Sequence, residues 1–291
     1  MKKFVILIPI YNDWDSLLKL VEKINQSIME KKNIQFDVVI INDGSTSLVP
    51  KIKIPVNIKS IKIINMKTNK GHARCNAFGI RYLTKRENFD YLILMDGDGE
   101  DRPEEINLLI SKVLEHKKNS VVAKRIKRSE GFFFKFAYEV HKIITYILTG
   151  KKINFGNFSC LTKEDVETLS NKASLWSSFS GTLKKYINPL NEINSIRGSR
   201  YFGPSKMSIF KLIIHSFAII AVFKNTVFIR SSIMIVLMSI IRNYIDLPAI
   251  LIFQIFLVVF NLFIFFISLR ENQKDLLSSH LNEESSTIIK H

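Results

Sequence analysis

The chain has 291 residues, of which 47% are hydrophobic, and it carries a formal net charge of +16. This length and composition allow one large domain or two small ones with a sizeable core, and they exclude a chain that is disordered throughout. The charge suits an anionic partner. Because the basic residues follow no helix-turn-helix, zinc-finger or RNA-binding pattern, we expect phosphates and a membrane surface rather than nucleic acid.

The first part of the chain alternates between strand and helix patterns. Continuous β-branched runs predict strands, and apolar residues three or four positions apart predict the helices between them. The first run stops at Pro9 without a cleavage site of small residues, so we interpret it as a buried strand and not as a signal peptide. The expected strands are 4–8, 36–41, 61–65, 91–95 and 121–123, and the expected helices are 15–31 and 71–84.

This alternation predicts an α/β fold, with a mostly parallel sheet and helices on both of its faces. Ligands of such sheets bind beyond the carboxyl ends of the strands. Polar loops follow three of the expected strands at that edge, and they contain Pro9-Ile10-Tyr11-Asn12, Asn42-Asp43-Gly44-Ser45 and Asp96-Gly97-Asp98. We therefore expect the functional site at this edge.

A basic cluster and an aromatic-rich helix follow the fifth expected strand. The cluster contains Arg125 and Arg128, and apolar residues at helical spacing continue from Phe133 to Ile147. Two interpretations stay open. The helix belongs to the core, or it lies against lipid and presents the basic loop to headgroups.

The C-terminal part predicts a membrane anchor. Residues 247–269 are 23 positions without a charge, enough for a helix to cross a hydrocarbon core of roughly 30 Å. A shorter uncharged run at 231–241 and a polar turn complete a hairpin with both ends on one side, which the positive-inside rule assigns to the cytoplasm. The basic residues on that side are Lys206, Lys211, Lys224, Arg230, Arg270 and Lys274.

Four parts of the chain follow from these patterns. They are a cytosolic domain over 1–204, a juxtamembrane amphipathic helix over 205–226 whose His215 faces headgroups, a two-helix transmembrane hairpin over 227–270, and a polar tail over 271–291 that we expect to be disordered. Both termini would then be cytoplasmic, and the aromatic-rich helices are compatible with a homo-oligomer. The competing interpretation of the hairpin is the buried helical core of a soluble protein.

Asp96 and Asp98 lie one residue apart after an apolar strand and point to a shared hard cation, Mg²⁺ or Mn²⁺. Alone, this pair is also typical of an ordinary turn. Together with three other polar segments in this order, it resembles the family-two glycosyltransferases, which have the GT-A (Rossmann-like) fold. The segments are residues 9–12, 42–46, 69–76 and 95–104.

Features further along the chain resemble one branch of that family, the polyprenyl-phosphate glycosyltransferases, which include dolichol-phosphate mannose synthases and undecaprenyl-phosphate sugar transferases. These features are the basic segment 125–128, the helix after it, Gly156-Asn157-Phe158, the block 197–207 and the terminal hairpin. The resemblance implies a nucleotide-sugar donor and a polyprenyl-phosphate acceptor.

The resemblance also implies roles for individual residues at the donor. Asp43 would accept hydrogen bonds from the base or ribose, and Gly71 would allow close approach of the backbone to the nucleotide. The remaining residues around the nucleoside would be Pro9, Tyr11, Asn12 and Asp13.

Phosphates and metal would take the charged positions of the same pattern. Asp96 and Asp98 would hold the divalent metal on the diphosphate, and Glu100, where some relatives carry glutamine, would complete its shell. Arg200 and Lys206 match basic positions that contact phosphates of the nucleotide sugar. Arg125 and Arg128 would bind the acceptor phosphate.

The acceptor decides whether a general base is needed. A sugar hydroxyl must lose a proton as it attacks, whereas a lipid monophosphate, with a second pKa of about 6, is already a nucleophilic dianion at neutral pH. Residues 171–192 contain no acidic pair of the kind that hydroxyl-glycosylating relatives carry. We therefore expect inverting transfer to a polyprenyl phosphate. Transfer to a hydroxyl of a lipid-linked glycan, or a catalytically inactive membrane scaffold, are the alternatives.

Overall fold

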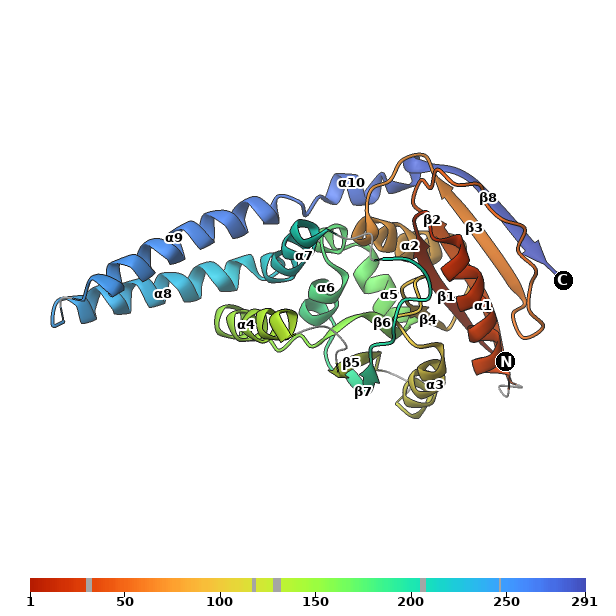
Figure 1. The fold of residues 1–291 in the computed structure, drawn as a ribbon, viewed down its shortest axis with the longest axis horizontal. Helices are drawn as coiled ribbons and strands as arrows, with labels where there is room; N and C mark the ends of the chain where they lie inside the picture. Colours follow the sequence, from red (N-terminus) through yellow and green to blue (C-terminus); the bar gives the residue numbers. More distant parts are fainter. Residues whose placement is uncertain (30–32, 117–118, 128–131, 205–207, 246) are drawn as a thin grey trace.

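The computed structural model describes the chain except for residues 30–32, 117–118, 128–131, 205–207 and 246. A sheet with the strand order β7-β5-β6-β4-β1-β2-β3-β8 forms its centre (Figure 1). The strands are β1 (Lys2–Ile10), β2 (Ile34–Asn42), β3 (Ser60–Met66), β4 (Tyr91–Leu94), β5 (Val121–Lys127), β6 (Phe155–Thr162), β7 (Asn191–Ile196) and β8 (Glu283–Lys290).

Helices connect and cover these strands. The α-helices are α1 (Trp14–Ile28), α2 (His72–Arg86), α3 (Ile106–Glu115), α4 (Phe132–Thr149), α5 (Lys163–Ser170), α6 (Phe179–Tyr186), α7 (Ile209–Ala221), α8 (Lys224–Arg242), α9 (Pro248–Ser268) and α10 (Gln273–Leu277). Short 3₁₀ helices are η1 (Pro103–Glu105), η2 (Ala173–Trp176) and η3 (Ser279–Asn282).

The α/β fold predicted from the sequence is confirmed, with a mixed sheet. The central strands β4, β1, β2 and β3 run parallel to one another. Strands β6 and β8 run antiparallel to their neighbours. The parallel centre therefore brings the carboxyl ends of β4, β1 and β2 to one edge.

Both faces of the sheet are buried, which explains why its strands have continuous apolar sequences. Along β1, Phe4, Ile6 and Ile8 belong to the hydrophobic cluster that includes α1 and α3. Val5 and Leu7 point the other way, into the cluster that includes α2, α5 and α6. The result is a three-layer arrangement of helices, sheet and helices.

Helices α8 and α9 form a hairpin that extends away from the sheet and turns at its far end (Figure 1). Both are long and apolar enough to cross a membrane, yet only 11% and 22% of the residues in their most apolar stretches are buried. The helical core of a soluble protein would be mostly buried. The structure therefore argues against that interpretation of the hairpin.

The base of the hairpin packs against α4 and α7. A separate hydrophobic cluster joins Leu148 of α4 to α7 and to Phe260 and Ile264 of α9, and Arg230 of α8 donates a hydrogen bond to the carbonyl of Ile147 (2.9 Å). Ile143 on α4 is 57% exposed. Helix α4 thus buries one side and leaves an apolar side open, as a helix lying against lipid does.

In helix α7, the side that is exposed differs from the side predicted to face headgroups. Ser208 caps it, its Oγ accepting from the Lys211 N–H (3.3 Å). Its exposed side is mainly apolar, with Phe210 and Ile213 beside Lys211. His215 is half-buried instead. Burial lowers the pKa of His215 to about 4, and the nearby charge of His72 lowers it as well. The expectation that His215 faces headgroups was wrong, because the apolar side of α7 is the one turned outward.

The C-terminal tail is ordered, and the prediction of disorder was wrong. Leu276 of α10 is fully buried in the cluster that contains α2. Strand β8 pairs antiparallel with β3 from Ser60–Lys290 to Met66–Glu283 and closes that edge of the sheet. Most side chains of this edge strand remain in solvent, so its sequence is polar and carries little strand signal.

Candidate functional site

The loops after β1, β2 and β4 meet at the carboxyl edge of the sheet, as parallel neighbours must. The Asp43 N–H donates to the carbonyl of Ile10 (2.9 Å), which ties the end of β2 to the end of β1. A Cβ added to Gly97 would lie 2.9 Å from the Ile10 side chain. The acidic loop after β4 therefore packs directly on the end of β1, and only glycine fits at that contact.

Asn12 joins the first two loops. Its φ of +50° is in the left-handed region, and its Oδ1 accepts from the backbone N–H groups of Thr46 (2.9 Å) and Ser47 (3.1 Å). Tyr11 beside it is 40% exposed. Asn12 thus shapes the loop, on which the Tyr11 side chain is partly exposed, whereas Pro9 is buried at the end of β1.

Asp43 and Gly71, both predicted to lie near the nucleotide, are in direct contact. The two carboxylate oxygens of Asp43 accept from the N–H groups of Lys70 (2.9 Å) and Gly71 (2.8 Å). Burial raises the pKa of Asp43, and these two N–H groups partly oppose that effect. Gly71 has a φ of +90°, a conformation that favours glycine. Each oxygen of Asp43 keeps a lone pair for a further donor.

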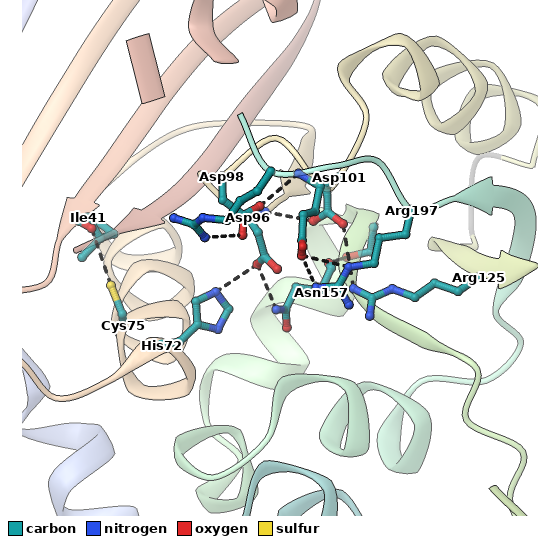
Figure 2. Close-up of polar contacts among 12 residues, drawn as sticks. Ile41, His72, Cys75, Asp96, Asp98, Asp101, Arg125, Asn157 and Arg197 are labelled. Atoms are coloured by element: carbon teal, nitrogen blue, oxygen red, sulfur yellow. Dashed lines mark hydrogen bonds and ion pairs between the residues drawn. The ribbon is translucent and has the colours of Figure 1, made fainter. Parts of the chain in front are cut away.

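Asp96 is held by two side chains from other elements. Figure 2 shows His72 and Asn157 pointing at it, with Nε2 and Nδ2 at 2.9 Å and 3.0 Å from Asp96 Oδ1. Burial alone would raise the pKa of Asp96, but the charge and hydrogen bond of His72 outweigh it and lower the pKa. Burial likewise opposes the positive charge on His72, yet Asp96 raises the pKa of His72 overall. Each group therefore favours the charged form of the other.

Arg200 brings two distant carboxylates together. Its Nη1 lies 3.0 Å from Asp98 Oδ2, and its Nη2 contacts Asp13. Burial and then the charge of Asp96 raise the pKa of Asp98 to about 6. The predicted residues Asp13, Asp98 and Arg200 therefore share one cluster, although they come from three separate parts of the chain.

The Glu100 carboxylate forms an ion pair with Arg197, and the Glu100 N–H donates to Asp98 Oδ1 (3.0 Å). Within the described part of the chain, no three histidine, cysteine, aspartate or glutamate side chains are grouped closely enough to hold a metal ion alone. Asp96 and Asp98 still fit a hard cation, since Mg²⁺ commonly takes one or two carboxylates and completes its shell with water and substrate phosphates. Glu100 does not join such a shell in this conformation.

Arg125 lies on the other side of the acidic loop. Its Nη2 is 4.0 Å from Asp101 Oδ1, and Asp101 Oδ2 accepts from the Asp96 N–H (2.9 Å). A Cβ on Gly156 would lie 2.6 Å from Arg125 Nη2, so the absence of a side chain there makes room for the guanidinium. Two further predicted phosphate ligands, Arg128 and Lys206, lie outside the described residues.

Four residues at the site were not assigned a role from the sequence. His72 directly follows Gly71 in one of the polar segments, and Asn157 lies in the Gly156-Asn157-Phe158 feature, so their positions were available without their contacts. Asp101 and Arg197 act on neighbours within the site, and no spacing rule indicates such a pairing. The four residues are His72, Asp101, Asn157 and Arg197, all labelled in Figure 2.

Sequence comparison gives a match over most of the sheet domain. Residues 5–187 match the family model for Glycosyl transferase family 2. The undecaprenyl-phosphate 4-deoxy-4-formamido-L-arabinose transferase of Serratia proteamaculans is 24% identical over 218 residues, and that of Photorhabdus laumondii is 25% identical over 218 residues. Each match covers 73% of this chain and 65% of the relative.

Solved structures share the fold. Staphylococcus aureus TarS (residues 1–349) in complex with UDP-GlcNAc aligns with a TM-score of 0.50 at 15% identity, covering 77% of this chain and 66% of that chain. Glucosyl-3-phosphoglycerate synthase of Mycobacterium tuberculosis, in complex with Mn²⁺, UDP-glucose and phosphoglyceric acid, aligns with a TM-score of 0.52 at 12% identity. That alignment covers 78% of this chain and 80% of that chain. At these identities the likeness shows a common GT-A architecture.

Proposed function

This chain belongs to glycosyl transferase family 2, and we propose on that basis that it transfers a sugar from a nucleotide-diphosphate sugar to the phosphate of a polyprenyl carrier at the cytoplasmic face of a membrane. The observation that carries the proposal is the carboxyl edge of the sheet. There Asp43, the Asp96–Asp98 pair and Arg125 lie around one loop cluster, joined through α7 to an apolar hairpin. The names of the relatives support the same acceptor class.

The donor would bind with its nucleoside at Asp43 and its diphosphate at the acidic loop. Asp43 offers lone pairs to a base or ribose, and the exposed Tyr11 lies beside it on the neighbouring loop. Asp96 and Asp98 would hold Mg²⁺ or Mn²⁺ against the diphosphate. A divalent cation bound there supplies charge stabilisation for the departing nucleotide without a proton transfer.

Arg200 would exchange partners when the donor binds. In the structure its guanidinium forms ion pairs with Asp98 and Asp13. A diphosphate arriving with its own cation offers the guanidinium new acceptors, and Arg–phosphate contacts are charge-assisted and often bidentate. Arg200 would then stabilise negative charge on the leaving group.

The acceptor phosphate would bind at Arg125. An oxygen of the lipid phosphate attacks the anomeric carbon from the face opposite the nucleotide, so the new carbon–oxygen bond forms as the bond to the diphosphate breaks. This single displacement inverts the anomeric centre. No general base takes part, because the phosphate is already a dianion. Asp101 is buried and fixed by its hydrogen bond from the Asp96 N–H. Because its other oxygen faces the Arg125 guanidinium, Asp101 would serve to position Arg125.

The hairpin would hold this reaction at the bilayer. With α8 and α9 crossing the membrane, both of their sheet-proximal ends lie on the side of the site (Figure 1). Lys224 and Arg270 mark those ends, which matches the positive-inside rule for a cytoplasmic domain. A polyprenyl chain in the same leaflet would present its phosphate to the loop cluster.

Nucleotide release by the purified chain in detergent tests the proposal. A panel of nucleotide sugars is offered with Mg²⁺ or Mn²⁺, with and without undecaprenyl phosphate, beside the Asp98→Ala variant. Turnover that requires metal, lipid phosphate and Asp98 is the expected result and identifies the sugar. Turnover only with a lipid-linked glycan would favour the hydroxyl acceptor, and no nucleotide binding at all would favour the inactive scaffold.

A further inference from the structure

The C-terminal tail reaches the loop that holds Asp43. After the hairpin, α10 and η3 lead the chain back along α2 to β8, which pairs with β3. At the junction of η3 and β8, Asn282 lies against the loop formed by residues 67–71. This is the loop whose N–H groups bind the Asp43 carboxylate.

Four hydrogen bonds join the tail to the start of that loop. Asn282 Nδ2 donates to the Thr68 carbonyl (2.9 Å), and Asn282 Oδ1 accepts from Thr68 Oγ1 (2.9 Å). The Lys67 N–H donates to the Asn282 carbonyl (2.8 Å), and Lys67 Nζ donates to the Leu281 carbonyl (3.0 Å). The side chain and the backbone carbonyl of Asn282 thus form hydrogen bonds with two loop residues, Lys67 and Thr68.

The loop has little freedom between Thr68 and Asp43. A Cβ on Gly44 would lie 2.7 Å from the Asn69 nitrogen and 2.9 Å from the Thr68 carbonyl carbon. The loop therefore rests directly on the residue that follows Asp43. Only two residues separate Thr68 from Gly71, whose N–H binds Asp43 Oδ2, so a shift at Thr68 would be transmitted to that hydrogen bond.

The tail also forms one wall of a cleft beside Asp43. The cleft has a volume of about 460 Å³. Asp43, Lys70 and Arg74 line it from the sheet and α2 side, and Ser278 and Asn282 line it from the tail side. The tail is firmly attached elsewhere, through buried Leu276 and through the Arg86–Glu283 ion pair (2.8 Å).

We propose that Asn282, in the segment after the hairpin, is a positioning residue of the donor site, which holds residues 67–71 so that Asp43 can receive the nucleoside. The inference rests on the proposed function, because it assigns the nucleoside to Asp43. It adds a determinant from beyond the membrane hairpin, outside the 5–187 segment that matches the family model.

Binding of UDP and of GDP to the full chain in detergent, measured by calorimetry with Mn²⁺, tests this role. We expect Asn282→Ala to weaken binding of the accepted nucleotide about tenfold, since two hydrogen bonds to the loop are lost. Thr68→Val removes one partner of Asn282 and should weaken binding in the same direction. In turnover assays the KM for the donor should rise while kcat changes less than about twofold, because Asn282 touches no reacting atom.

Two variants in the same tail serve as controls. Glu283→Gln breaks the ion pair with Arg86 without touching Thr68, and Thr287→Ala changes an exposed residue of β8. Both should bind nucleotide as the parent chain does. Equal weakening by Glu283→Gln would mean that any loosening of the tail suffices and would overturn the role of Asn282.

The outcomes separate this inference from the function beneath it. Nucleotide binding by the parent chain that Asn282→Ala and Thr68→Val leave unchanged would overturn the inference and leave the proposed function standing. A parent chain that binds neither nucleotide would overturn both. Should Asn282→Ala fail to fold, Thr68→Val alone decides, because it leaves β8 and its pairing intact.

Discussion

The sheet edge and the α8–α9 hairpin differ in the partners of their polar side chains. At the edge, partly buried carboxylates are each paired with a basic side chain: Asp96 with His72, Asp98 with Arg200 and Glu100 with Arg197. In the hairpin the few polar side chains pair between the helices, as Ser231 and Asn261 do (2.7 Å), and the surface is apolar.

This difference indicates which solvent each region meets. A sheet edge open to water keeps its charges because a polar ligand or ion can replace their present partners. A surface such as that of α9, where Val259 is 58% exposed, has no polar solvent to match and suits hydrocarbon. The first region is therefore built for exchange of charged partners, and the second for a fixed position in lipid. Four predictions test that separation.

The largest effect is expected at the acidic loop. Asp96→Asn should lower kcat/KM for nucleotide release about 10²–10³-fold, because it removes a charge that stabilises the leaving diphosphate. Membrane insertion should be unaffected. Steady-state kinetics measures the loss, and Glu104→Gln, an exposed change in the following turn, is the matched control. Equal activity of the two variants would contradict the role of Asp96.

A charge in the middle of α9 should impair membrane insertion and leave nucleotide binding intact. Val259→Arg is expected to cost about 2.5–3.5 kcal/mol of insertion free energy, whereas Val259→Leu should insert as the parent does. An insertion reporter, or the fraction recovered with membranes, measures this. Nucleotide binding in detergent should survive the change. Full insertion of Val259→Arg would show that this face of α9 does not meet lipid.

The pH dependence of metal binding should report Asp98. Because its pKa is raised to about 6, Asp98 is ionised above that pH and protonated below it. A proton then competes with the metal, so the apparent Mn²⁺ affinity should fall about tenfold for each pH unit below 6. Titrations between about pH 5 and pH 7.5 measure it. An Asp98→Asn variant lacks this proton, and its residual affinity should lose that slope.

The smallest effect is expected between the hairpin helices. Asn261→Leu removes the hydrogen bond to Ser231, and such bonds inside membranes contribute about 0.6 kcal/mol on average. Unfolding of the chain in mixed detergent should shift only slightly. Leu262→Val, on the exposed side of α9, controls for volume. A loss of several kcal/mol would indicate that the Ser231–Asn261 pair does more than join two helices.

Much of the fold could be predicted from the sequence because local patterns carried it. Strands buried on both faces have continuous apolar runs, so β1, β2 and β4 were recognisable, and their polar ends marked the site. The hairpin was recognisable for a similar reason, since a long uncharged run has few other uses. The carboxylates at positions 43, 96 and 98 followed from the same strand ends.

Other features depend on contacts between distant segments. Arg200 meets Asp98 and Asp13 only because the chain returns from β7 across the acidic loop, and His72 reaches Asp96 only because α2 begins beside β4. Strand β8 looks like a disordered tail until the open edge of β3 provides its partner. Local spacing encodes helices, strands and their exposed ends, whereas the pairing of groups far apart in the chain is decided by how those elements pack. The tertiary structure alone therefore determined the partners of each charge and the place of the tail.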